Sequence, residues 1–138
     1  MSKIRLLVII QKDPLGEGIG GVHTFNNGLI RCLPDDFEME LVGVTTDKIK
    51  RPVGKWKVIK FEQKKIKFFP VLHTFDQNKR NKIPMSLRFE LSLLRYKIKI
   101  SLKDRILIFH RPEPAILFNK TENKKVLYIH GNVDNLHN

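Results

Sequence analysis

The segment from Ile4 to Ile10 reads IRLLVII and is continuously apolar from Leu6 onward. An apolar run without alternation is typical of a strand covered on both faces, as in a parallel sheet. A helix is predicted next, because four apolar residues recur at helical spacing: Val22, Phe25, Leu29 and Leu33. Residues Glu38–Val44, EMELVGV, then predict a second strand. These segments together predict a β-α-β unit.

The rest of the chain extends this alternation. Weaker patterns predict strands over Trp56–Phe61 and Phe68–Phe75, whose pairing the sequence leaves open. Clearer short apolar runs predict strands over Arg105–Phe109 and Lys125–Ile129. The pattern favours an α/β fold with a Rossmann-like, doubly wound and mainly parallel sheet. Without an evident linker or repeat, residues 1–138 are expected to form a single domain.

A basic amphipathic helix is predicted over Ser86–Lys103. Its apolar positions at helical spacing are Leu87, Leu91, Leu94, Ile98 and Leu102, and its adjoining basic stripe is Arg88, Arg95, Lys99 and Lys103. The apolar stripe can pack in the core, or it can rest on an anionic membrane while the basic stripe meets the headgroups. Peripheral contact with an anionic membrane is therefore one of two interpretations of this helix.

The net charge of +12 is concentrated in the middle of the chain. The range Asp47–Arg105 holds 18 Lys or Arg against 5 Asp or Glu, and the remainder holds 8 against 9. Such a block attracts nucleic acid, acidic lipid and phosphorylated substrates alike. The single cysteine, Cys32, fits a reducing compartment and is expected to be a packing residue. With neither a membrane-length apolar run nor a signal peptide, we expect a soluble cytoplasmic protein.

Glycines lie between the first strand and the first helix. Gly16, Gly18 and Gly21 match the dinucleotide pattern G-x-G-x-x-G, although Gln11 to Leu15 separate them from the strand. The alternative is a loop ending in Gly20-Gly21 at a helix N-terminus, where backbone amides and the helix dipole attract a diphosphate. This second interpretation predicts a phosphate-binding loop at Gly20 and Gly21.

Histidines follow two of the predicted strands. His130 comes after the last apolar strand, and His110 follows Phe109 within the sequence HRPEP. Ligands of doubly wound sheets gather beyond the carboxyl ends of the strands, so both imidazoles are candidates for a shared cleft. Arg111 offers an anion clamp and Glu113 a hydrogen-bond acceptor, or the two brace the loop as an ion pair. His23, one turn into the first helix, faces the same cleft or solvent.

Motifs of metal sites and complete catalytic centres are missing from the sequence. It has no C-x-x-C pair, H-E-x-x-H, G-x-S-x-G or Walker sequence, so metalloprotease, serine hydrolase and P-loop functions have no local support. We expect no metal and no resident cofactor.

The order of a first strand, Gly20-Gly21-Val22-His23, LIFHRPEPAILF and KKVLYIHGN resembles the N-terminal domain of the retaining GT-B glycosyltransferases of family four. The resemblance implies an acceptor-side domain of an enzyme that moves a sugar from a nucleotide-sugar donor to a glycan or lipid-linked acceptor. It implies that Gly20 and Gly21 face the donor diphosphate and that His130, as the catalytic histidine, lies near the transferred sugar. It assigns Arg111 and Glu113 to a polar pair of the cleft.

The resemblance also implies that the donor-binding C-terminal domain lies outside these 138 residues, so the isolated chain is expected to be inactive and to self-associate through exposed sheet edges. Two other functions stay open. One is a non-enzymatic polyanion or nucleic-acid binder, although RNA-binding aromatic motifs are missing and nucleic acid is not the expected partner. The other is a dinucleotide-binding oxidoreductase domain.

Overall fold

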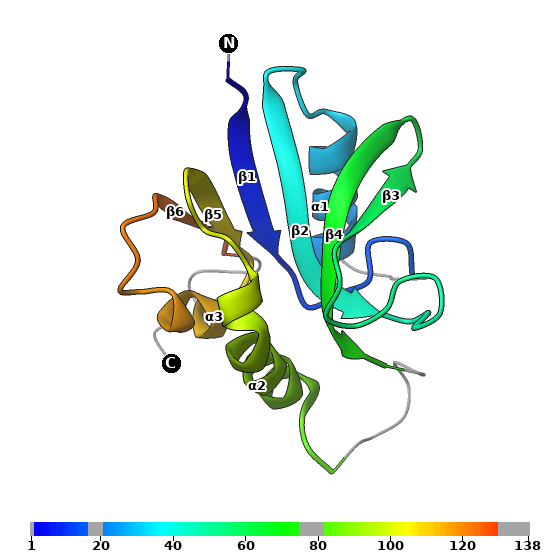
Figure 1. The fold of residues 1–138 in the computed structure, drawn as a ribbon, viewed down its shortest axis with the longest axis vertical. Helices are drawn as coiled ribbons and strands as arrows, with labels where there is room; N and C mark the ends of the chain where they lie inside the picture. The colour runs from blue at the N-terminus through cyan, green and yellow to red at the C-terminus, as the bar shows by residue number, and fades with distance from the viewer. Residues whose placement is uncertain (1, 17–20, 75–81, 130–138) are drawn as a thin grey trace.

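The computed structural model describes residues 2–16, 21–74 and 82–129. In this part of the chain one sheet has the strand order β3-β4-β2-β1-β5-β6, with helices on both faces (Figure 1). The strands are β1 Ile4–Ile9, β2 Phe37–Thr45, β3 Lys57–Phe61, β4 Lys64–His73, β5 Arg105–Phe109 and β6 Lys125–Leu127. The helices are α1 Gly21–Arg31, α2 Met85–Tyr96 and α3 Pro112–Leu117, with a short 3-10 helix, η1, at Lys97–Lys99.

The sheet is wound in both directions from β1. This strand pairs in parallel with β2 on one side and with β5 on the other, and the pairs β2–β4 and β5–β6 are also parallel. The β3–β4 pair is antiparallel. The chain leaves β1 through α1 on one face and returns to β5 through α2 on the opposite face (Figure 1). The predicted α/β fold with a mainly parallel sheet is confirmed, and it is compatible with a Rossmann-like fold.

Each face of the sheet has its own hydrophobic core, which explains the continuous apolar run of β1. Leu6, Val8 and Ile10 enter the core that α1 closes, behind the sheet in Figure 1. Leu7 and Ile9 enter the core that α2 and α3 close, in front of the sheet. A strand that is buried on both faces needs apolar side chains at every position.

The helix predicted over Ser86–Lys103 is shorter than expected and turned to the other side. α2 ends at Tyr96, and its buried residues are Phe89 and Leu93, which belong to the core in front of the sheet. Four residues of the predicted apolar stripe are exposed, so the stripe does not pack in the core: Leu87, Leu91, Leu94 and Ile98. α2 carries apolar side chains on two opposite faces, and the face with Phe89 packs against the sheet.

The region of open pairing contains a β-hairpin. β3 and β4 pair from Lys57 with Phe68 to Phe61 with Lys64, so Glu62 and Gln63 form a two-residue turn. Glu62 has a left-handed φ of 55°, a conformation that usually signals glycine or asparagine. The strand predicted over Phe68–Phe75 therefore begins earlier, at Lys64.

Three further expectations need correction. Cys32, expected to pack, is exposed just after the end of α1. Phe25 is 37% exposed rather than part of the core. α3 was not predicted, because its sequence PEPAIL holds two prolines, but both lie in the first turn, where a helix needs no backbone N–H donor.

A buried carboxylate joins three strands toward their amino ends. Glu40 of β2 is 2% exposed and accepts two hydrogen bonds from Arg105 of β5, Nε to Oε2 at 2.7 Å and Nη2 to Oε1 at 3.1 Å. Arg5 of β1 donates a third bond through Nη2 at 2.6 Å. Burial alone raises the pKa of Glu40, but the bonds from Arg105 and Arg5 outweigh it and hold this pKa below its usual value.

A second buried carboxylate joins two loops beyond the carboxyl ends. Asp13 accepts hydrogen bonds from the backbone N–H of Leu15 at 2.9 Å and from the backbone N–H and hydroxyl of Thr46, each at 2.8 Å. Arg51 donates a charged bond to it at 2.8 Å. The loop after β1 is thereby tied to the loop after β2.

Candidate functional site

A hollow of about 180 Å³ lies beyond the carboxyl ends of β1 and β5. These neighbouring strands continue to opposite faces of the sheet, so the hollow occupies the topological switch point, where doubly wound proteins bind ligands. Its apolar lining residues are Ile9, Ile10, Val22, Phe89 and Pro114, and its polar ones are Gln11, Lys12, His110 and Arg111.

His110 lies at the end of β5 and is almost buried. Its ring contacts Phe25 of α1 edge-on at 5.7 Å between centroids and stacks on Tyr128 at 5.8 Å. Phe25 and Tyr128 also contact each other, at 4.8 Å. The partly exposed Phe25 therefore joins α1 to the carboxyl ends of β5 and β6. This aromatic cluster fixes the plane of the imidazole beside the hollow.

Arg111 presents its guanidinium beside the same hollow. Glu113 holds it in a fork, with Nη2 to Oε1 at 2.9 Å and Nε to Oε2 at 3.3 Å. The hydrogen bond from Arg111 lowers the pKa of Glu113, and the bond to Glu113 raises the pKa of Arg111. The two interpretations of this pair, an ion pair and a lining of the cleft, are compatible, because Glu113 pairs with Arg111 and Arg111 lines the hollow.

Glu90 of α2 belongs to the same group of charges. Burial raises its pKa above the usual value, the negative charge of Glu113 adds to that effect, and Arg111 partly offsets it. A carboxyl group with a raised pKa near a cleft is a candidate for proton transfer. The sequence analysis did not single out Glu90, since its helical position carries no motif.

The loop that supplies Gln11 and Lys12 is held close to β2. The backbone N–H of Val44 donates to the Lys12 carbonyl at 3.1 Å. Gly43 permits this approach, because a Cβ atom there would lie 2.6 Å from the Lys12 oxygen. The sequence analysis did not propose Gln11 or Lys12 as site residues. Their position just after a buried strand, which identified His110, could have indicated them as well.

The structure places the remaining predicted residues as follows. Gly21 is the first residue of α1 and is exposed, with open space where a Cβ atom would be. His23 does not line the hollow; its Nε2 lies 3.0 Å from Asn27 Nδ2, one turn along α1. Gly20 and the predicted catalytic residue His130 lie outside the described residues, as does Gly18. Gly16 lies in the turn that Asp13 fixes, where its N–H donates to the Asp13 carbonyl.

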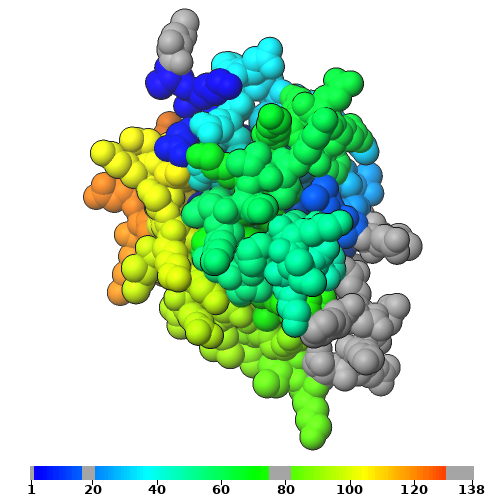
Figure 2. Space-filling model, turned by 45° about the vertical axis from the view of Figure 1, so that its right-hand side comes forward, coloured from blue at the N-terminus to red at the C-terminus, as the bar shows by residue number. Residues whose placement is uncertain are grey.

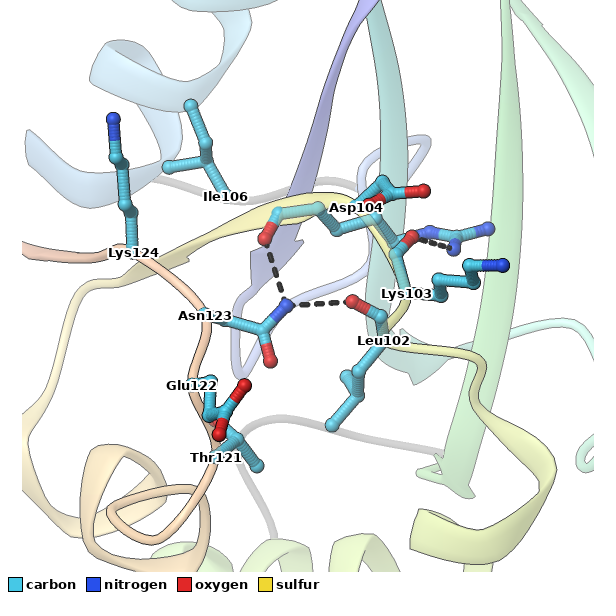
Figure 3. Close-up of a pocket in the computed structure, with 9 residues that line it drawn as sticks. Leu102, Lys103, Asp104, Ile106, Thr121, Glu122, Asn123 and Lys124 are labelled. Atoms are coloured by element: carbon cyan, nitrogen blue, oxygen red, sulfur yellow. Dashed lines mark hydrogen bonds between the residues drawn. The ribbon is translucent and has the colours of Figure 1, made fainter.

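Two larger hollows lie elsewhere. One of about 580 Å³ opens at the amino end of β5, where the Asn123 amide donates to the carbonyls of Leu102 and Arg105 (Figure 3). The ammonium groups of Lys103 and Lys124 point away from each other there, so these two cations do not converge on one ligand. We therefore place the candidate site at the smaller hollow.

The second, of about 320 Å³, lies between the β3–β4 hairpin and the segment after α2, which come together on the face seen in Figure 2. Its lining includes Trp56 and the lysines Lys57, Lys67 and Lys99. The lining thus combines cations with one aromatic ring, a combination that can bind an organic anion, and it also includes the ion pair of Glu40 with Arg105.

Within residues 2–16, 21–74 and 82–129, His, Cys, Asp and Glu side chains form no group of three that could hold a metal ion. Over the same ranges, every helix is too short or too polar to cross a bilayer. No protein-family model, curated protein or solved structure was found to match the chain.

Proposed function

We propose that this chain forms the acceptor-side domain of a retaining GT-B glycosyltransferase. The observation that carries the proposal is the hollow at the topological switch point, where His110 and Arg111 meet the loop after β1. A GT-B enzyme receives its acceptor at this edge of its N-terminal domain. The resemblance in the order of the Gly20-Gly21, HRPEP and IHGN segments supports the same proposal.

The side chains of the hollow suit a sugar or another polyhydroxylated acceptor. Gln11 and His110 can exchange hydrogen bonds with hydroxyl groups, and Arg111 can pair with a phosphate or carboxylate on the acceptor. Apolar residues such as Phe89 form a surface against which a sugar ring can rest. The lining of the hollow therefore combines the hydrogen-bonding, charged and apolar groups that recognition of such an acceptor would need.

In the proposed reaction the bond between the anomeric carbon and the donor diphosphate breaks, a bond to the acceptor oxygen forms on the same face, and the hydroxyl proton passes to the departing diphosphate. Backbone amides at Gly20 and Gly21 would stabilise the negative charge that develops on the departing diphosphate. His130 would lie close to the transferred sugar. These two roles follow from the resemblance, and the donor is a substrate rather than a resident cofactor.

The experiment begins with the native polypeptide. An antibody against this chain should detect a protein well above 16.2 kDa in the source cells. The immunopurified protein should transfer label from a panel of radioactive nucleotide sugars to an extract of the same cells, whereas the 138-residue chain alone should not. A native band at 16.2 kDa without transfer would overturn the proposal.

A matched pair of variants tests the site itself. Arg111→Gln in the native polypeptide should lower transfer by about tenfold or more, the loss of one charged contact to substrate. Arg31→Gln is the control, because Arg31 is similarly exposed and also forms one ion pair with a glutamate, Glu62 at 2.7 Å. Equal activity of the two variants would place the acceptor elsewhere.

A second candidate function, polyanion binding, is favoured by the 320 Å³ hollow with its three lysines. It predicts that heparin or RNA binds the chain with an affinity that falls steeply with salt. Substitution of Lys57 and Lys67 by glutamine should then weaken binding more than substitution of Lys48 and Lys50, which do not line this hollow.

A further inference from the structure

The outer face of α2 presents a line of exposed aliphatic side chains. Leu87, Leu91 and Leu94 are 50%, 57% and 55% exposed, and Ile98, just beyond the helix, is 96% exposed. Ile83, just before the helix, is 50% exposed. The spacing of Leu87, Leu91 and Leu94 keeps these three on one side of α2, and Ile83 and Ile98 flank its two ends. We call these five residues the outer stripe.

The outer stripe is not needed to hold α2 in place. The opposite face of the helix buries Phe89 and Leu93 completely, and Tyr96 contacts the ring of Phe69 at 5.9 Å. In Figure 2 the lime-green segment of α2 lies at the surface, at the lower end of the molecule. Scattered exposed leucines are common, but an aligned row of them marks an interaction surface.

Positive charges lie along one flank of the outer stripe, since Arg88, Arg95 and Lys99 recur at helical spacing beside it. Between Lys82 and Lys103 the sequence holds six Lys or Arg and one acidic residue, Glu90. Arg95 and Lys99 both lie over the ring of Tyr96, at 5.5 and 5.7 Å from its centre. These contacts keep both charges next to the helix. The partner must therefore be apolar where it meets the leucines and anionic beside them.

The geometry points to the surface of an anionic lipid bilayer as this partner, with α2 lying in the plane of the headgroups. The stripe would enter the boundary between headgroups and acyl chains, while the lysines and arginines meet lipid phosphates. A second copy of the chain is disfavoured, because it would bring together two copies of the basic segment from Lys82 to Lys103. The inference goes beyond the proposed function and does not depend on it, because the stripe faces away from the hollow that Phe89 lines.

Flotation with two kinds of vesicle tests the inference. One kind is pure phosphatidylcholine, and in the other about a third of the lipid is phosphatidylglycerol, an anionic content that attracts basic segments. The chain should float with the anionic vesicles and remain free with the neutral ones. Equal behaviour with both kinds would overturn the inference.

Matched variants separate the stripe from the general charge of the protein. Leu91→Ser combined with Ile98→Ser should reduce partitioning at least about tenfold, given the apolar area removed. Ile49→Ser is the control, because Ile49 is almost as exposed as Ile98 but lies outside the stripe. Should the double variant float like the wild type, or the control lose as much, binding would be due to diffuse charge and the inference would fail.

Two further measurements test whether the variants remain folded and whether the stripe binds a second copy of the chain. Thermal unfolding should be nearly the same for the double variant and the wild type, because these side chains are exposed; Ile98→Ser alone replaces the double variant if it is not. Sedimentation should give the same oligomeric state for the wild type and for the stripe variants. A dimer that the stripe variants dissociate would assign the stripe to a second copy and overturn the membrane assignment.

Discussion

The two ends of the sheet each bury a carboxylate against arginine, but for different purposes. Toward the amino ends, Glu40 takes its partners from neighbouring strands, Arg5 and Arg105. Beyond the carboxyl ends, Asp13 takes its partners from loops, including the backbone of Thr46 and the side chain of Arg51. At the amino ends, the charges of Glu40, Arg5 and Arg105 pair with one another and join the strands. Beyond the carboxyl ends, Asp13 holds two loops together, and nearby polar residues line a hollow.

The comparison teaches how a sheet of similar strands acquires one functional edge. Arg105 makes both of its forked bonds to Glu40, so it has few donors left for a ligand. Lys12 is instead held through its backbone carbonyl, which accepts a hydrogen bond from the Val44 N–H, and both Gln11 and Lys12 line the hollow. Loops held by main-chain contacts can present side chains that strands locked by side-chain contacts cannot.

The largest expected effect comes from removing the charge at the amino end. Glu40→Gln should lower the free energy of unfolding by about 3 kcal/mol, because Arg105 is left buried without a full counter-charge. Urea unfolding measures this loss. Glu38→Gln is the control and should change the free energy of unfolding little, since Glu38 is partly exposed and its carboxylate lies as far as 3.9 Å from Arg5.

The same residue gives the comparison a pH dependence. Because the pKa of Glu40 is lower in the folded protein than its usual 4.5, its contribution is present above that value. The contribution is lost as pH falls through the lowered pKa. Wild-type stability should therefore fall more steeply than that of Glu40→Gln in acid, as measured by urea unfolding at a series of pH values. Parallel curves would contradict this assignment.

A smaller loss is expected at the carboxyl end. Asp13→Asn keeps an oxygen acceptor but removes the charge that faces Arg51, which should cost about 2 kcal/mol. Amide hydrogen exchange should quicken at Thr46 and Leu15, whose N–H groups donate to Asp13. Asp47→Asn is the control, as Asp47 accepts exposed bonds within its own turn. If exchange at Thr46 is unchanged, Asp13 does not hold the two loops together.

The close approach of the first loop to β2 provides a milder test. Gly43→Ala should destabilise the protein by about 1 to 2 kcal/mol, because the new Cβ must displace the Lys12 carbonyl. Gly28→Ala in α1 meets nothing within 4 Å and should stabilise by up to about 1 kcal/mol. Thermal unfolding distinguishes the two. A neutral Gly43→Ala would show that the loop yields without cost.

The smallest expected effect lies at the exposed ion pair of the hollow. Glu113→Gln should change stability by less than about 0.5 kcal/mol, as exposed pairs contribute little. Any contribution is lost as pH falls through the lowered pKa of Glu113. Transfer by the native polypeptide should nevertheless fall, since Arg111 loses its brace. Denaturant unfolding and the transfer assay together separate position from stability.

Much of the fold could be predicted because periodicity and composition agree over most strands. β5 has the predicted bounds, and β1 is one residue shorter than predicted. The hairpin escaped prediction because its turn residue Glu62 adopts a left-handed conformation that no sequence signal marked. The orientation of α2 could not be predicted because two opposite faces of this helix are apolar. Periodicity alone cannot decide whether the face with Phe89 or the face with Leu91 is buried.

The candidate site could be predicted only through the rule that ligands gather at carboxyl ends. That rule identified His110 and Arg111, which the structure brings to one hollow. It did not find Phe89, which lines the hollow, or Glu90, which interacts with the charges of Arg111 and Glu113, because their positions depend on which face α2 buries. Such residues become visible only when the packing of the helix is known.

The position of β1 in the middle of the sheet has a consequence for the newly made chain. β2 can fill one edge of β1 soon after β1 is made, but the other edge of β1 pairs with β5, which follows about a hundred residues later. At ordinary rates of translation that interval lasts at least about five seconds. For that time the nascent protein carries an open apolar strand edge, and Glu40 has Arg5 but not yet Arg105. The hydrogen bonds that join β1, β2 and β5 through Glu40 are therefore complete only after Arg105 has been synthesised.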